Sequence, residues 1–169
     1  MNLSIKHILL AEDDPRDAKL TLDALEGHHL ANRVFVVNDG EAVLDYLYCE
    51  GKFKGREGGN PVALLLDLKM PKVDGLEVLK IMKADVLLKS IPVIMLTSSR
   101  ETPDLTECYA HGVNAYVVKP VDFQEFENAV NQLGIFWAAI NEPPPQDGKV
   151  APVIPTRKTQ FLTNLRITK

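Results

Sequence analysis

Five short apolar runs rich in β-branched residues alternate with segments of helical spacing, and this alternation restricts the fold more than any other feature of the chain. The runs begin at Ile5, Arg33, Val62, Ile91 and Ala115. Each has the length and composition of one buried strand. Strands that alternate with helices usually form a parallel sheet covered on both faces. The pattern therefore predicts an α/β fold with five strands.

Capping residues indicate where the intervening helices begin and end. The predicted starts combine a capping side chain, a proline or a glycine: Asp14 with Pro15, Asp39, Gly75, Thr102 with Pro103, and Asp122 with Glu125. Glycines at 27 and 112 are predicted to end the first and fourth helices. Segment 51–60 holds four of the ten glycines and is predicted to be a flexible loop.

Length and composition exclude several classes of protein. The chain has 169 residues, of which 46% are hydrophobic and 25% are charged. It lacks both an apolar run of about 20 residues and a secretory signal. We therefore expect a soluble, cytoplasmic protein that does not contact membranes. Cys49 and Cys108 are far apart and form no CxxC pattern, which argues against a disulfide framework or a thiolate zinc site.

The end of the chain differs from the rest in charge and proline content. Five of the eleven prolines lie between residues 143 and 155, and five basic but no acidic residues follow Asp147. We expect a domain over residues 1–140 and an extended or disordered basic tail over residues 141–169, either a solvated end or a docking arm. The preceding chain is therefore more acidic than the total charge of −4 indicates. Such a surface repels phosphates, so DNA binding is not expected.

Polar side chains gather where the predicted strands end. They are Glu12, Asp13 and Asp14 after the first strand, Asp67 after the third, Thr97 and Ser98 at the fourth, and Lys119 at the fifth. If the strand order is 2-1-3-4-5, the first and third strands are neighbours and their carboxylates face one crevice. Asp14 is expected to cap the first helix, with a metal role as the alternative.

Crowded carboxylates repel one another unless they take up protons or share a cation. Oxygen ligands with room for water suit Mg²⁺ or Mn²⁺, and the four histidines have no spacing typical of a zinc or copper site. A carboxylate beside such an ion, opposite a hydroxyl and an ammonium group, can accept a phosphoryl group. Asp67 is the candidate nucleophile, with Thr97 and Lys119 as the neutralising groups.

Four motifs in order resemble the receiver domain of bacterial two-component response regulators over about residues 5–140. They are EDD, DLKMPKVDG, MLTSS and YVVKP. The resemblance implies a flavodoxin-like doubly wound sheet, with Asp67 as the phosphoacceptor and Glu12 and Asp13 as the acidic pair. It also implies that Asp13, Asp67 and the backbone carbonyl of Lys69 bind Mg²⁺ directly. Lys69 and Ser99 would tune the lifetime of the phosphoryl group.

The same resemblance implies a switch and a dimer. Thr97 would be the switch hydroxyl, Tyr116 the aromatic switch, and Lys119 would precede Pro120 through a cis peptide bond. The fourth helix, fifth strand and fifth helix would form a homodimer face. Phe136, Trp137 and Ile140 cannot all face the core at helical spacing, so some apolar surface is expected near the end of the fifth helix. Phe136 and Trp137 are candidate interface residues.

The chain is more narrowly similar to small stand-alone regulators paired with phytochrome kinases, on the strength of LLAEDDPRDAKLTLDALE, MLTSSRE and GIFW. This similarity implies a sensor histidine kinase, a phytochrome, as the partner in a phosphorelay. The chain would then be a phosphoacceptor with slow self-dephosphorylation rather than an enzyme. The alternative is a receiver fold that serves only dimerisation or interaction, without phosphorylation. A phosphatase of the haloacid dehalogenase type would need a second Asp where Lys69 stands.

Overall fold

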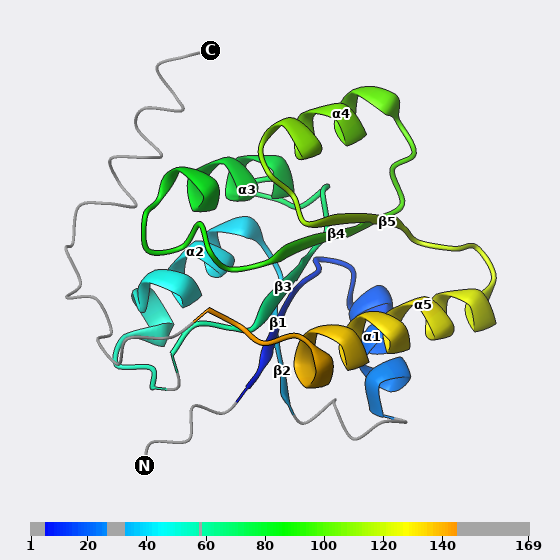
Figure 1. Ribbon diagram of the computed structural model, residues 1–169, viewed down its shortest axis with the longest axis horizontal. Helices are drawn as coiled ribbons and strands as arrows, with labels where there is room; N and C mark the ends of the chain where they lie inside the picture. The colour runs from blue at the N-terminus through cyan, green and yellow to red at the C-terminus, as the bar shows by residue number, and fades with distance from the viewer. Residues whose placement is uncertain (1–5, 27–32, 58, 145–169) are drawn as a thin grey trace.

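One parallel sheet forms the centre of the computed structural model, which describes residues 6–26, 33–57 and 59–144. Its strands lie in the order β2-β1-β3-β4-β5 (Figure 1). They are β1 (Ile8–Ala11), β2 (Val34–Val37), β3 (Ala63–Leu66), β4 (Val93–Thr97) and β5 (Ala115–Val118). All neighbouring strands pair in parallel. The predicted α/β fold and its strand order are confirmed.

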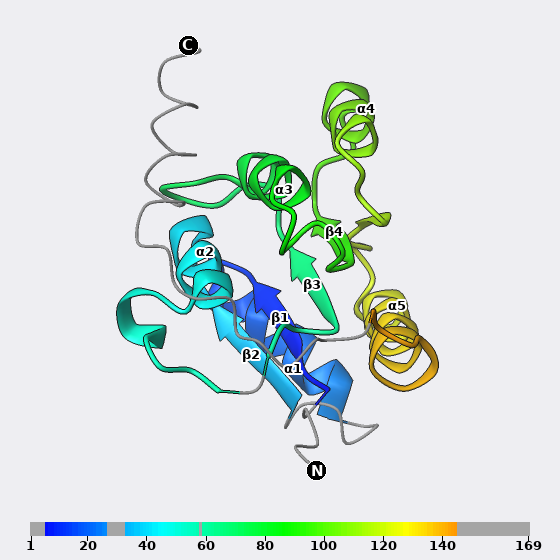
Figure 2. The same ribbon diagram turned by 60° about the vertical axis from the view of Figure 1, so that its left-hand side comes forward.

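Five α-helices of the described chain cover the two faces of the sheet. They are α1 (Pro15–Glu26), α2 (Gly40–Tyr48), α3 (Gly75–Ala84), α4 (Thr102–Ala110) and α5 (Phe123–Ile135). Helices α1 and α5 lie on one face, and α2, α3 and α4 lie on the other (Figure 1 and Figure 2). The predicted caps Asp39 and Asp122 are confirmed, since they accept hydrogen bonds from the first turns of α2 and α5. α3 begins at Gly75 as predicted and is capped by Asp74, whereas α4 begins at Thr102 without a side-chain cap.

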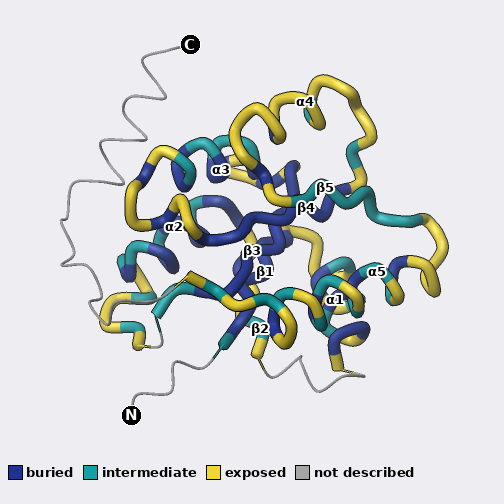
Figure 3. Tube along the Cα trace, viewed as in Figure 1, coloured by how far each residue is buried: buried dark blue, intermediate teal, exposed yellow. Residues whose placement is uncertain are grey.

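Burial follows the position of each strand in the sheet. β1 and β3 are buried at every position, because helices cover them on both sides (Figure 3). The prediction of a fully buried strand is wrong for β2 and β5, which form the two edges. In β2, Phe35 is 53% exposed and Val36 is 40% exposed, and β5 is half-buried throughout. An edge strand lacks one neighbour, so its side chains pack less completely.

The predicted loop at 51–60 is more ordered than its glycines suggest. It opens with the short 3₁₀ helix η2 (Gly51–Phe53). Arg56 then stacks on the Tyr46 ring, with its guanidinium carbon 4.0 Å from the ring centroid. The same side chain donates hydrogen bonds to the backbone carbonyls of Tyr46 at 3.2 Å and Gly59 at 2.6 Å. These contacts hold the described part of the segment against α2.

The last α-helix that the structure describes, α5, ends in a short π-helical segment. α5 continues into η3 (Phe136–Ile140), which has π-helical hydrogen bonding, and Asn141 after it is extended. Most of the predicted tail, residues 145–169, lies outside the described residues, as does the predicted helix stop at Gly27. Among the helices that the structure describes, none combines the length and apolar character required to cross a membrane.

Asp39 joins α2 to the loop after β3. Its Oδ1 accepts a hydrogen bond from the backbone N–H of Ala42 at 2.7 Å, and its Oδ2 lies 2.8 Å from the Lys72 ammonium. Burial acts to raise the pKa of Asp39, but the Lys72 ammonium and the Ala42 N–H outweigh it and hold the pKa below its usual value. The charged carboxylate therefore stabilises the fold.

Asp39→Ala is expected to lower the free energy of unfolding at neutral pH by about 1 kcal/mol for the lost cap, plus the loss of the ion pair. Asp39→Asn keeps a good cap and should lose the charge contribution alone. Because the pKa is depressed in the folded state, this contribution is present above the unfolded pKa of about 4 and is lost as the pH falls through the folded pKa. Urea unfolding at several pH values measures it. If the difference in free energy of unfolding between wild type and Asp39→Asn did not decrease at acidic pH, this account would be wrong.

Candidate functional site

Three carboxylates meet where β1 and β3 end. Ala11 and Leu66, the last residues of the two strands, are partners in the sheet, and the backbone N–H of Asp67 donates to the carbonyl of Ala11 at 3.0 Å. One carboxylate oxygen each from Glu12, Asp13 and Asp67 lies within 4.8 Å of the other two. The structure thus brings together the acids that the sequence placed at neighbouring strand ends.

Two of these carboxylates are removed from water. Glu12 is 3% exposed and Asp67 is 8% exposed, while Asp13 lies at the surface. Burial raises the pKa of Glu12, and the charge of Asp67 adds to this effect. Burial also raises the pKa of Asp67, against the opposing effects of Lys119, of a hydrogen bond from Thr97 and of the Leu68 N–H at 2.9 Å. Negative charge in this buried cluster therefore costs free energy, and a bound cation would reduce that cost.

The donor set fits a hard divalent cation. Only carboxylate oxygens converge in the triad, and this is the chemistry that Mg²⁺ and Mn²⁺ prefer. Asp13 is exposed, so solvent can reach the cluster from that side. Asp14 is outside the triad, because its Oδ1 caps α1 by accepting from the N–H of Arg16 at 2.7 Å. Of its two predicted roles, the structure supports the cap.

Close backbone packing holds the loop that carries Asp67. The N–H of Gly75 donates to the carbonyl of Leu68 at 2.9 Å, and a side chain at Gly75 would overlap the Asp67 carbonyl. Lys69, two residues after Asp67, is exposed, and its ammonium lies 3.5 Å from the Asp104 carboxylate. The loop that carries Asp67 is therefore held to α4 as well as to α3.

Thr97 and Tyr116 are connected through the loop after β4. Thr97 is fully buried, and its Oγ1 accepts a hydrogen bond from the N–H of Ser99 at 3.2 Å. The Tyr116 hydroxyl donates to the carbonyl of Ser99 at 3.2 Å. The Ser99 hydroxyl donates to Asp104 at 2.6 Å. A movement of Thr97 would therefore shift Ser99. The hydrogen bonds of Ser99 with Tyr116 and with Asp104 on α4 would then change.

Lys119 points into the acidic cluster from the end of β5. Its Nζ lies 2.6 Å from Glu12 Oε2 and 2.7 Å from Asp17 Oδ2. Burial acts to lower the pKa of Lys119, but the hydrogen bonds with Asp17 and Glu12 outweigh it, so the pKa is raised and the ammonium stays charged. The predicted cis bond before Pro120 is wrong, since the described chain contains no cis peptide. The cis and trans forms of a bond before proline differ by only about 1 kcal/mol, so a proline alone does not decide between them.

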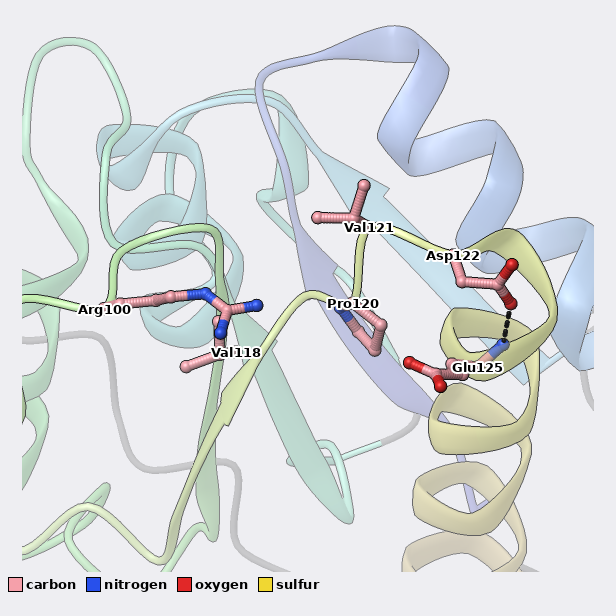
Figure 4. Close-up of a pocket in the computed structure, with 6 residues that line it drawn as sticks. All are labelled: Arg100, Val118, Pro120, Val121, Asp122 and Glu125. Carbon is pink, nitrogen blue, oxygen red and sulfur yellow. Dashed lines mark hydrogen bonds between the residues drawn. The ribbon is translucent and has the colours of Figure 1, made fainter.

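An open pocket of about 680 Å³ lies between the loop after β4, the end of β5 and the start of α5. It is lined by Arg100, Val118, Pro120, Val121, Asp122 and Glu125 (Figure 4). Figure 4 shows the Asp122 carboxylate turned to the Glu125 N–H, the bond that caps α5 at 3.0 Å. Val121, at the edge of the pocket, is 97% exposed. The pocket thus combines apolar side chains with Arg100 and two carboxylates, and it is lined by different residues from those of the acidic triad.

Phe136 and Trp137 have different environments. Phe136 is 46% exposed and Ile140 is 64% exposed, which confirms the expected apolar surface at this end of the chain. Trp137 is partly buried and packs against the core formed by α1, α5 and the sheet. The two rings meet edge to face with centroids 5.0 Å apart. The partly buried Trp137 ring therefore packs against the exposed ring of Phe136.

Asp17 and Asp104 contact the predicted site residues and were not among the candidates from the sequence. Asp17 lies four residues after Asp13, in the first turn of α1, and this short separation could have indicated that it lies near the site. Asp104 looked like an ordinary acid in the first turn of a helix, and no local pattern linked it to Lys69 or Ser99.

A family model described as the response regulator receiver domain matches residues 8–131. The chain belongs to this family. Among curated relatives it is 39% identical over 140 residues to a probable methanogenesis regulatory protein, FilR2 of Methanothrix harundinacea, covering 81% of this chain and 86% of that protein. It is 33% identical over 132 residues to the response regulator Rcp1 of Synechocystis, covering 78% of this chain and 88% of Rcp1.

Solved structures point to phytochrome-associated members of the receiver family. The bacteriophytochrome response regulator RtBRR is 53% identical and covers 96% of both chains, with a TM-score of 0.67. The phosphorylated cyanobacterial phytochrome response regulator RcpA is 34% identical and covers 83% of this chain and 99% of its own, with a TM-score of 0.77. The Mn²⁺-bound form of Rcp1, at 32% identity and the same coverage of both chains, has a TM-score of 0.76. This receiver chain is therefore related to phytochrome response regulators.

Proposed function

We propose that this receiver is a stand-alone response regulator that accepts a phosphoryl group on Asp67 from a histidine kinase. The observation that carries the proposal is the convergence of the Glu12, Asp13 and Asp67 carboxylates with Lys119 in one crevice. A phytochrome is the kinase that the relatives favour, since RtBRR and RcpA are named as phytochrome response regulators. We place this activity in the cytoplasm, in a domain over residues 1–140 followed by the tail at 141–169.

The reaction would be an in-line displacement at phosphorus. A carboxylate oxygen of Asp67 attacks the phosphohistidine, the new O–P bond forms as the N–P bond breaks, and the electron pair leaves with the imidazole. Lys119 and the Thr97 hydroxyl, which both act on the Asp67 carboxylate, would interact with the phosphoryl oxygens and offset their charge. Mg²⁺ or Mn²⁺, held by Asp13, Asp67 and the Lys69 carbonyl with Glu12 nearby, would supply further positive charge. Such a chain is a phosphoacceptor with slow self-dephosphorylation.

The new charge on Asp67 would then be transmitted to the surface. Thr97 would move toward the phosphoryl group, and the hydrogen-bonded path through Ser99 would carry the change to Tyr116 and α4. Lys69 and Ser99, which both contact Asp104, would influence the lifetime of the phosphoryl group. Phosphorylation biases an equilibrium between two conformations rather than creating a new fold.

Intact mass spectrometry tests the central step. The purified chain is incubated with acetyl phosphate, with and without Mg²⁺. A gain of one phosphoryl group that requires Mg²⁺ supports the proposal. No gain under any condition would contradict it and favour a receiver fold used only for interaction.

We further propose that α4, β5 and α5 form a homodimer face. On α4, Tyr109 is 54% exposed and Leu105 is 39% exposed, and Phe136 at the end of α5 is 46% exposed. Tyr109→Ser is expected to raise the dimer dissociation constant about tenfold, as for an aromatic interface residue. Sedimentation velocity measures this, with Val86→Ser as the control because Val86 is 68% exposed in the loop after α3. Equal effects of the two substitutions would contradict this interface.

A further inference from the structure

Asp17 on α1 makes a contact that the receiver reaction, as described above, does not use. Its Oδ2 lies 2.7 Å from the Nζ of Lys119, a residue 102 positions away in the chain. The Asp17 side chain is 38% exposed, whereas that of Lys119 is 10% exposed. Asp17 thus reaches from the rim of the crevice to a lysine that is nearly buried in it.

An ordinary role for Asp17 would be to stabilise the first turn of α1, where an acid interacts favourably with the helix dipole. That role requires no partner for the side chain. Its carboxylate instead binds the lysine at the end of β5. Asp23 on the same helix provides a comparison, because it pairs at 2.7 Å with Lys19 one turn away at the surface. Asp17 differs from Asp23 because its partner is Lys119, a residue of the candidate site.

The ammonium group of Lys119 has three protons to donate. Glu12 accepts one at 2.6 Å and Asp17 accepts another at 2.7 Å. Among the described residues, Lys119 has ion pairs with these two acids and none with Asp67. A phosphoryl group on Asp67 would present further anionic oxygens to the same ammonium. One proton of the ammonium group remains for the phosphoryl group, but the contact with Asp17 limits how far Lys119 can move toward Asp67. Asp17 and the phosphoryl group therefore compete for the position and the charge of one cation.

We propose that Asp17 is a positioning residue that holds Lys119 before phosphorylation and weakens its hold on the incoming phosphoryl group. This inference rests on the proposed role of Asp67 as the phosphoacceptor. Asp17 also adds one negative charge beside the acidic triad, which favours a divalent cation and disfavours a phosphoryl anion. Loss of the Asp17 charge should therefore affect the two ligands in opposite directions. A general loosening of the crevice would weaken the binding of both.

The test compares wild type with Asp17→Asn, with Asp23→Asn as the control of equal charge change on the same helix. Asp17→Glu retains a carboxylate and should behave like wild type. Calorimetry gives the dissociation constants of Mg²⁺ and, at saturating Mg²⁺, of beryllofluoride, an inorganic mimic of the phosphoryl group. Intact mass spectrometry gives the rate of phosphorylation by acetyl phosphate. In this reaction the bond between Asp67 and phosphorus forms as the bond between phosphorus and the acetate oxygen breaks, and acetate leaves.

For Asp17→Asn we expect beryllofluoride to bind several-fold more tightly, acetyl phosphate to react several-fold faster and Mg²⁺ to bind several-fold more weakly. Asp23→Asn should match wild type in all three measurements. Unchanged values for Asp17→Asn, or weaker binding of both ligands, would overturn the inference while wild-type phosphorylation upholds the proposed function. If wild type takes up no phosphoryl group, the proposed function fails and this inference fails with it.

Discussion

Asp67→Asn is expected to take up no phosphoryl group from acetyl phosphate at any Mg²⁺ concentration. An amide oxygen carries no full negative charge and cannot form the acyl phosphate that a carboxylate forms. The same substitution should raise the free energy of unfolding in the absence of metal. Burial raises the pKa of Asp67, so at neutral pH its charged form destabilises the native state. The amide side chain of the variant would keep the shape of the carboxylate without the repulsion from Asp13 and Glu12.

Mass spectrometry measures the first effect, and urea unfolding without Mg²⁺ measures the second. Added Mg²⁺ should stabilise wild type more than the variant, because the variant has lost one of three carboxylates. Asp23→Asn, at the surface of α1, should be phosphorylated and unfold like wild type. Uptake by Asp67→Asn at the wild-type level would show that another residue is the acceptor.

Gly75→Ala is expected to lower the free energy of unfolding by about 3 kcal/mol, toward the upper end of the usual cost of overpacking. The new Cβ would overlap the Asp67 carbonyl and lie 2.9 Å from the Cα of Leu68, both backbone atoms that no rotamer change can move. This overlap can be removed only if α3 and the loop that carries Asp67 move apart. Asp67 would then shift relative to Glu12, so phosphoryl uptake should fall together with stability.

Gly55→Ala is the matched control for this substitution. Gly55 has a φ of 80°, and a Cβ there meets no atom within 4 Å. The cost should be only the backbone strain of about 1 kcal/mol, without effect on phosphoryl uptake. Chemical denaturation and intact mass distinguish the two variants. If Gly75→Ala were no more destabilising than Gly55→Ala, close packing at Gly75 would not be what holds the loop that carries Asp67.

Local patterns were sufficient for much of the fold because they arise from short-range forces. Asp39 and Asp122 cap helices through hydrogen bonds that span three residues, and such bonds depend only on neighbouring sequence. The burial of β2 and β5 was predicted less well. An apolar run indicates a strand, but whether that strand lies at the centre or the edge depends on neighbours elsewhere in the chain. Phe35 is exposed for this reason.

The sequence by itself determined the alternation of strands and helices and the acids at the strand ends, since both follow from periodicity and from the direction of parallel strands. Tertiary structure decided which charges meet. Lys119 pairs with Glu12 and Asp17, and Lys69 pairs with Asp104. The energy of an ion pair depends on distances between groups that are far apart in the chain, and several acids were equally available to each lysine. Only the folded arrangement of α1, α4 and β5 selects among them.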